Sequence, residues 1–224
     1  MKADYRIIFS RRRNLMLTVE RDRSIVVTAP LGTSLEAIHQ AIESRKLWLY
    51  EKTRHAQKNF LPPHPPGKEL VSGESAPYLG RCYRIEFTDS DDEIRFEKKF
   101  IVPRRLVNKT KAFQAWFIKK AEIKILPRVP LHAKRLGVIY KEAKLGNGKY
   151  RWGSCTPHNN VLINWRLIKA PLFVIDYVIV HELAHLIEPN HSALFWDIVR
   201  AQITNTDKAK AWLLKNGALL QQDF

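Results

Sequence analysis

The stretch that most constrains this chain is an apolar run of helical character that carries the motif His-Glu-x-x-His. It covers residues 178–187, and its two histidines, His181 and His185, stand four positions apart. Residues four apart lie one turn apart on the same face of an α-helix, so both imidazoles can reach one ion. Glu182 is turned off that axis but can reach a water molecule beside the ion. Two nitrogen ligands, an adjacent base and an open position are what a zinc hydrolase needs.

The apolar surroundings of the motif strengthen the prediction of a metal site. Two histidines and a glutamate in such a helix are costly to bury without partners, and a zinc ion removes that cost for both imidazoles. The alternative is a pair of core histidines that are satisfied independently. A catalytic zinc usually has three protein ligands. His191 is the preferred third ligand, because the Pro-Asn pair at 189–190 would let the chain turn back toward the ion. Glu188 and the more remote His158 are alternatives.

Charge, cysteine content and hydropathy narrow the class of protein. The 224 residues include 38 Lys and Arg against 22 Asp and Glu, a net charge of +16. This excess favours acidic partners or nucleic acid, although a solvated basic surface explains it equally well. Cys82 and Cys155 are far apart and outside any C-x-x-C pair, which fits a reducing compartment. The N-terminus lacks an apolar segment, so we expect no secretory signal and a cytoplasmic location. Residues 170–187 are interrupted by charged and histidine side chains and predict a buried helix rather than a membrane span.

The first half of the chain has the pattern of a β-rich region with one long helix. Short β-rich runs lie at residues 5–9, 15–19, 25–29, 78–87, 93–97 and 100–102. The first three predict a small antiparallel meander. Thr33 or Ser34 can then cap a helix that runs to about His55. The proline-rich residues 59–68 cannot form a regular helix and predict a loop or linker.

The second half of the chain becomes more helical after Pro103. We expect helices at about 109–125, 127–137, 171–187, 192–199 and 207–215, and strands at 138–140, 143–145, 150–155 and 161–165. The first helix carries lysines on one side and aromatics on the other. Its basic face could meet nucleic acid, but the simpler interpretation is an amphipathic helix that buries its aromatics. We therefore expect an α+β protein with a β-rich N-terminal part, 1–102, and a second domain, 103–224.

Several short segments around the motif share one further pattern. They are Arg-Trp-Gly-Ser-Cys at 151–155, Asn164, residues 176–185, residues 190–192 and Phe-Trp at 195–196. Together they resemble the YgjP-like metallopeptidase family, also called the DUF45 family, and more distantly the SprT-like proteases associated with DNA–protein crosslinks. The resemblance is dense from about residue 134 to residue 200 and looser in the N-terminal half.

The resemblance implies a zincin-like catalytic domain, with the active-site helix against a small sheet, that acts on protein or peptide substrates. It implies His181, His185 and His191 as zinc ligands and Glu182 as the catalytic base. In zincins an extended substrate commonly lies along a strand near the active helix, and residues 161–165 are our candidate for that edge strand.

Other residues near the motif have roles that the sequence leaves open. Cys155 as a nucleophile has no local signature to support it, and a small buried residue is the simpler interpretation. Trp152 and Trp196 are assigned to packing rather than to substrate binding. Asn164 could orient a ligand or fix a turn. Arg151, Tyr150 and His158 are weak candidates for an oxyanion contact.

Two other functions are compatible with the same motif. One is a nucleic-acid-associated basic protein whose zinc is structural and closed by four ligands. The other is a metal-dependent hydrolase that acts on a non-peptide amide. Divalent ions other than zinc can also occupy such ligands.

Overall fold

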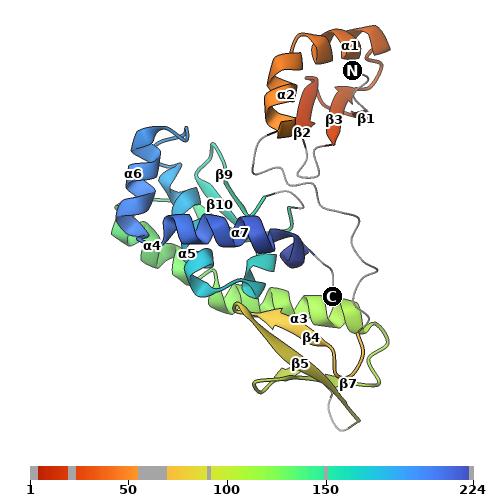
Figure 1. Ribbon diagram of the computed structural model, residues 1–224, viewed down its shortest axis with the longest axis vertical. Coiled ribbons are helices and arrows are strands. Elements are labelled where there is room, and N and C mark those ends of the chain that lie inside the picture. The colour runs from red at the N-terminus through yellow and green to blue at the C-terminus, as the bar shows by residue number, and fades with distance from the viewer. Residues whose placement is uncertain (1–4, 20–23, 55–69, 90–91, 149–150, 222–224) are drawn as a thin grey trace. The chain divides into compact units, whose positions relative to one another are not determined.

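The computed structural model describes residues 5–19, 24–54, 70–89, 92–148 and 151–221. The expected linker at 59–68, the end of the first long helix at His55 and the candidate Tyr150 lie outside these residues. The chain divides into two compact units, 1–64 and 65–224. The fold mixes helices with several small sheets, in agreement with the expected α+β class (Figure 1). Within the described residues, no helix combines the length and the apolar character that crossing a membrane requires.

The N-terminal unit is a three-stranded sheet followed by two helices. Its elements are β1 (Tyr5–Ser10), β2 (Met16–Val19), β3 (Ile25–Pro30), α1 (Leu35–Glu43) and α2 (Lys46–Arg54). The sheet order is β1-β3-β2, with β1 parallel and β2 antiparallel to β3. The predicted meander is therefore wrong, because β1 pairs with β3 and not with β2. The most apolar strand takes the central position, where Val27 is fully buried.

The helix expected from residue 34 to about residue 55 is two helices, with a break between Glu43 and Lys46. The predicted cap is confirmed, since the Ser34 hydroxyl accepts a hydrogen bond from the Ala37 amide at 3.2 Å. Ser44 then ends α1. Ile38 and Leu49, one from each helix, are buried in the same small core as the sheet.

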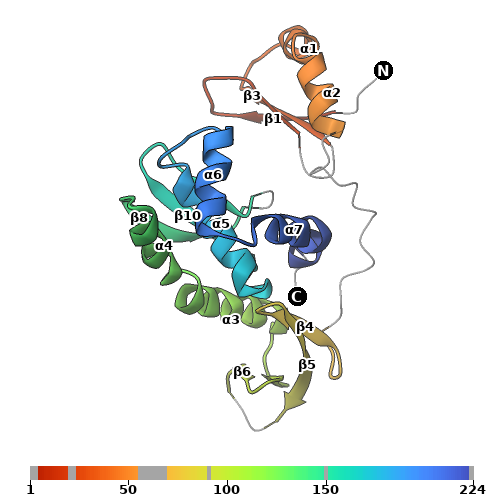
Figure 2. The same ribbon diagram turned by 60° about the vertical axis from the view of Figure 1, so that its left-hand side comes forward.

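The C-terminal unit contains a four-stranded sheet, a three-stranded sheet and the larger helices (Figure 1 and Figure 2). Its elements are β4 (Ser75–Tyr78), β5 (Arg81–Thr88), β6 (Arg95–Phe96), β7 (Phe100–Pro103), α3 (Lys109–Lys124), α4 (Arg128–Leu136), β8 (Glu142–Gly146), β9 (Gly153–Cys155), β10 (Asn160–Asn164), the 3-10 helix η1 (Trp165–Lys169), α5 (Leu172–Ala184), α6 (Ala193–Gln202) and α7 (Thr206–Gln221). The sheet orders are β4-β5-β7-β6 and β8-β10-β9.

The first of these sheets shares one hydrophobic core with the helices. Phe100 on β7 lies 4.9 Å from Phe113 and 5.2 Å from Trp116 between ring centroids, and Phe113 and Phe117 of α3 are buried. The division between the two compact units thus falls in the chain at 64/65, whereas the sequence analysis placed it at 102/103. Pro103 marks a change of secondary structure but not a gap in packing. The aromatics of α3 face this core, as the simpler interpretation of that helix requires.

A tight turn divides the long β-rich run expected at 78–87 into β4 and β5. Leu79 and Gly80 both have positive φ angles, 48° and 82°, as in a two-residue hairpin turn. A Cβ on Gly80 would lie 2.5 Å from Pro171 Cγ, so the position requires glycine. The Leu79 and Gly80 amides donate to the carbonyls of Ile168 and Lys169 at 2.9 and 3.0 Å. The turn therefore docks the hairpin directly against the segment that starts α5.

The last helix extends beyond its predicted end. We expected Gly217 to stop it, but α7 continues to Gln221 and Gly217 is buried within it. Residues 138–140, expected as strand, lie outside any strand, and β8 begins at Glu142. Cys82 and Cys155 are both free thiols.

Asp176 on α5 forms a partly buried ion-pair network with α4. Arg128 donates from Nε and Nη2 to the two Asp176 carboxylate oxygens at 2.5 and 2.6 Å, and His132 Nε2 lies 2.9 Å from Oδ1. Burial alone would raise the pKa of Asp176, but the hydrogen bonds from His132 and Arg128 outweigh it and hold the pKa below its usual range. A carboxyl whose pKa is lower in the folded state stabilises the fold above its unfolded pKa and loses that effect as pH falls through the folded one.

We expect Asp176→Asn to destabilise the metal-free protein by about 2–3 kcal/mol at pH 7, slightly below the cost of breaking a fully buried pair. The difference should shrink below pH of about 3.9, the usual Asp pKa, as the wild-type carboxyl becomes protonated. Urea denaturation at pH 7 and pH 3 measures both effects, with Asp197→Asn on an exposed position of α6 as the control. Equal stability of Asp176→Asn and wild type at pH 7 would contradict the assignment.

Candidate metal centre

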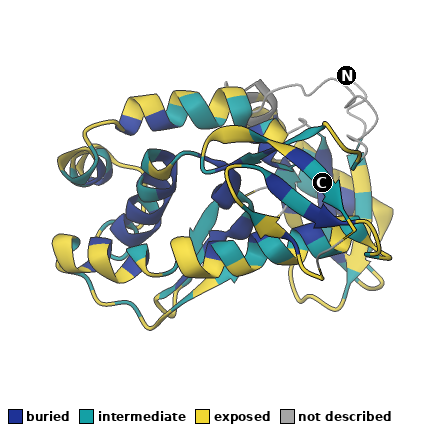
Figure 3. Ribbon diagram, turned by 90° about the horizontal axis from the view of Figure 1, so that it is seen from below, coloured by how far each residue is buried: buried dark blue, intermediate teal, exposed yellow. Residues whose placement is uncertain are grey.

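The helix that carries the motif is the most buried helix of the C-terminal unit (Figure 3). Ile175, Ile179 and Leu183 have no exposed surface. It begins after Pro171 and lies against β9 and β10 on one side and α6 and α7 on others. The regular helix ends at Ala184, and a turn continues through Ile187. A helix with this much packing is a rigid support for any side chain that it presents.

Three histidines converge at the end of this helix. Their ligand atoms all lie within 4.8 Å of one another. His191 Nε2 is 3.0 Å from His181 Nε2, and His185 Nδ1 lies 3.3 Å from the Glu188 carbonyl oxygen. An N–H at that Nδ1 donates to the carbonyl and leaves the other ring nitrogen of His185 with a free lone pair. The side chains that the motif predicted to converge are therefore brought together, with His191 beside them.

The two alternative third ligands lie elsewhere. The Glu188 side chain accepts a hydrogen bond from the Asn190 amide at 3.0 Å and so supports the turn toward His191. His158 is exposed in the turn that joins β9 to β10. Among the described residues, the potential metal-binding group contains neither of them.

The geometry and chemistry of the three histidines fit a zinc ion. Two imidazoles on one tetrahedral zinc, with bonds of about 2.0–2.1 Å, have nitrogens about 3.3 Å apart. The separation of His181 and His191 is close to this value, at 3.0 Å. Burial, and then the charges of His185, His191 and Lys210, lower the pKa of His181 to about 3, so its ring is neutral at pH 7. Neutral imidazole is the form that binds metal. Among the described residues, His181 Nδ1 is buried without a hydrogen-bond partner. Binding of an ion through Nε2 would place the ring proton on this nitrogen.

Aromatic side chains of α6 support the cluster. Phe195 is fully buried, and its ring centroid lies 4.9, 4.6 and 4.7 Å from those of His181, His185 and His191. Trp196 stacks on His191 at 5.7 Å, and the Lys210 ammonium of α7 lies 4.2 Å from the centre of the Trp196 ring. The Ser192 hydroxyl caps α6 through the Phe195 amide, as predicted. Trp196 thus packs, as expected, but it packs on the exposed histidine.

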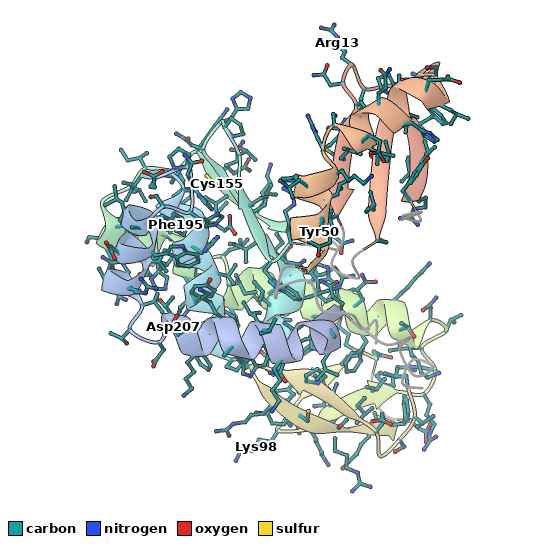
Figure 4. The ribbon with its side chains drawn as sticks, turned by 45° about the horizontal axis from the view of Figure 1, so that its top comes forward. Arg13, Tyr50, Lys98, Cys155, Phe195 and Asp207 are labelled. Atoms are coloured by element: carbon teal, nitrogen blue, oxygen red, sulfur yellow. The ribbon has the colours of Figure 1, made fainter. Side chains whose placement is uncertain are left out.

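Glu182 faces the short strand β9, where its side chain lies against Gly153 and near Cys155 (Figure 4 labels Cys155). Only 7% of the surface of Glu182 is exposed. Burial raises the pKa of Glu182 to about 7, against the opposing effects of a hydrogen bond from the Cys155 amide and the charge of Arg151. A carboxyl with a pKa near neutrality can both accept and return a proton at physiological pH.

The edge strand beside α5 is β9 and not the predicted residues 161–165. In the order β8-β10-β9, β10 is central and pairs on both sides. Val161 and Ile163 are fully buried, as suits a central strand. The prediction was wrong because nearness to the helix does not identify an edge strand, which can be short and contain glycine.

Asn164 fixes the loop that leads into β9. Its side-chain amide donates to the carbonyls of Gly148 and Arg151 at 2.7 and 2.9 Å, and its Oδ1 accepts from the Arg166 amide at 3.0 Å. Of the two roles left open for this residue, the structure shows the turn.

Of the remaining candidates, Trp152 is half-buried against the core. Burial and the nearby Glu182 raise the pKa of the Cys155 thiol, which disfavours the thiolate that a nucleophile needs. Arg151 is exposed, with its charge near Glu182.

Two neighbours of the site were not identified from the sequence. Tyr177 is buried one turn before His181, and the two ring centroids are 5.9 Å apart. The pKa of Tyr177 is raised, mainly by burial and to a smaller extent by the charges of Glu182 and Asp207. Its position four residues before a motif histidine was a usable signal. Gly153 packs against Glu182. It lies within the family pattern at 151–155, but that pattern does not indicate what the glycine contacts.

Comparison with known proteins agrees with the geometry. The chain resembles the zymogen of the metallopeptidase abylysin from Pyrococcus abyssi, whose crystal structure is known, with 19% identity and a TM-score of 0.37. That match covers 43% of this chain and 94% of the chain in that crystal structure. A search of curated proteins gives no match. The family model of the YgjP-like metallopeptidase domain matches residues 13–216, most of the chain. The predicted relationship is thereby confirmed, and the chain belongs to the YgjP-like metallopeptidase domain family.

Proposed function

We propose that this protein is a zinc-dependent peptidase with a zincin-like catalytic domain. His181, His185 and His191 would hold the ion, and Glu182 would be the general base. The observation that carries the proposal is the convergence of three imidazoles, whose ligand atoms lie within 4.8 Å of one another. The buried carboxyl of Glu182, the residue after His181, has a pKa of about 7. Membership of a metallopeptidase family implies a metal ion and supports the same conclusion.

A zinc ion bound there would polarise the scissile carbonyl and make an adjacent water molecule easier to deprotonate. Glu182 accepts the proton of the attacking water and later delivers it to the leaving amine. Its pKa near neutrality suits both transfers. His185 is held in one orientation by the Glu188 carbonyl, and His191 by the stacked Trp196 ring. The lysine behind Trp196 reinforces that stack.

The substrate chain would lie along β9. Main-chain hydrogen bonds at the two ends of the β9–β10 pair involve residues with even numbers: the Asn164 amide donates to the Trp152 carbonyl, and the Thr156 amide donates to the Asn160 carbonyl. Positions in an antiparallel pair alternate, so the peptide groups of Gly153 and Cys155 point away from β10. The Cys155 amide already donates to Glu182, so an extended peptide would add to this edge through the Gly153 peptide groups and the Cys155 carbonyl. Arg151, at the entrance to the strand, would favour an acidic side chain in that peptide.

Removal and return of the metal tests this function. A protein stripped with a chelator should lose at least about 100-fold of its activity on a mixed peptide library, and one equivalent of zinc should restore it. Mass spectrometry of the peptides measures cleavage and identifies the bonds cut. Full activity after quantitative metal removal, or a stoichiometric zinc protein that cuts no peptide, would contradict the proposal.

A further inference from the structure

Gly153 lies so close to Glu182 that no other residue fits without moving the carboxyl. A Cβ on Gly153 would stand 2.5 Å from Glu182 Cγ, 2.7 Å from Oε1 and 2.8 Å from Cδ. Its φ is not positive, unlike that of Gly80, so the backbone itself does not require glycine. What excludes a side chain at this position is the glutamate.

A second residue of the same strand contacts the same carboxyl. The Cys155 amide donates a hydrogen bond to Glu182. Gly153 and Cys155 are the alternate positions of β9 whose peptide groups face away from β10. β9 therefore touches Glu182 at both of these positions, through the Cβ side of Gly153 and through the outward amide of Cys155, and neither contact is used in pairing the sheet.

We propose that β9 is the positioning element of the catalytic base. The missing side chain of Gly153 leaves the space that the Glu182 carboxyl occupies, and the Cys155 amide fixes the carboxyl in that space. This inference rests on the proposed function, because it assigns the position of Glu182 a role in catalysis. Gly153 and Cys155 are positioning residues and do not take part in the chemistry.

The physical reason is the freedom of a glutamate side chain. Three torsions separate its carboxyl from the helix, so a rigid α5 alone does not fix where the base stands. A displacement of about 1 Å from the productive geometry can cost about 100-fold in rate. The atoms that an added Cβ would meet belong to the movable end of Glu182, so an alanine at 153 shifts the carboxyl and leaves the backbone in place.

The first experiment compares Gly153→Ala with Gly146→Ala. Gly146 ends β8, on the opposite edge of the same sheet, and its added Cβ would lie at an ordinary 3.7 Å from Leu162 Cβ. We expect Gly153→Ala to bind zinc as the wild type does, to lose about 100-fold in kcat and to change KM less than threefold. Gly146→Ala should match the wild type in all three. Wild-type kcat in Gly153→Ala would overturn the inference.

A readout without substrate separates this inference from the proposed function. The visible absorption of Co²⁺ in place of zinc, titrated with pH, follows ionisation around the ion. We expect its midpoint to shift in Gly153→Ala and not in Gly146→Ala. If the wild type cuts no peptide but the shift is seen, the function is wrong and the positioning stands. If the wild type cuts peptides and the two titrations coincide, the positioning is wrong.

The double variant Gly153→Ala with Glu182→Ala covers the case in which Gly153→Ala folds poorly. Removing the glutamate side chain removes the atoms that the new Cβ would meet. The double variant should therefore melt at the same temperature as Glu182→Ala alone and bind zinc equally well. A loss of stability from Gly153→Ala that is equally large with and without the glutamate would overturn the inference, because the glycine would then serve the backbone.

Discussion

Glu182→Gln is expected to bind zinc as the wild type does and to lose about 1,000-fold in kcat, within the range that general acid–base catalysis supplies. The amide has the shape of the carboxyl and can still accept the hydrogen bond from the Cys155 amide, but it cannot take a proton from water. The fold and the three histidines should be unaffected, because the exchange keeps the size and shape of this buried side chain. Zinc stoichiometry and single-turnover cleavage of a peptide that the wild type cuts measure the two effects.

The matched control is Glu122→Gln, the same exchange on an exposed position of α3. It should retain wild-type kcat. A loss in Glu182→Gln alone, after the same purification, would show that the activity does not come from a contaminating peptidase. Undiminished hydrolysis in zinc-loaded Glu182→Gln would remove this residue from the mechanism.

His191→Ala is expected to weaken zinc binding by about 1,000-fold, as follows if apparent binding energies of about 10–16 kcal/mol are divided among the ligands of a site. Activity should fall below detection at micromolar zinc, since two histidines on one helix cannot retain the ion. Competition with a chromophoric chelator measures the affinity, and zinc content after dialysis provides a second measure.

His158→Ala is the control for that change, because both histidines are exposed and His158 is the remote alternative ligand. We expect it to bind zinc with unchanged affinity. An equal loss in both variants, or a loss in His158→Ala alone, would mean that the third ligand has been assigned incorrectly.

The sequence was sufficient to predict the helix that carries the histidine motif, because its signals are local. Spacing places His181 and His185 on one face, and the Pro-Asn break after Glu188 predicts the turn that returns His191 to them. The caps Ser34 and Ser192 were likewise identified, since a cap depends on residues within one turn. The resemblance to the YgjP-like family was also confirmed, since the family model matches residues 13–216.

What the sequence did not predict depends on contacts between distant segments. Periodicity identifies strands but not their partners, so the parallel pairing of β1 with β3 was missed, as was the central position of β10. The division of the chain falls at 64/65 and not at 102/103, because Phe100 on β7 packs on Phe113 of α3 and joins the two segments in one unit. The change of composition near Pro103 does not reveal this contact. Gly153 is informative only once Glu182 is seen to face it.

The stack of Lys210, Trp196 and His191 bears on how a metal would enter and leave this protein. His181 and His185 are anchored on the buried α5, and Phe195 closes the space beside them. Of the three histidines, only His191 comes from an exposed turn, so release of a bound ion would begin with the departure of this ring. Its departure requires unstacking from Trp196, which also contacts Phe195 and the Lys210 ammonium of α7. The residence time of the ion would thus be set outside the motif, by two residues of the neighbouring helices.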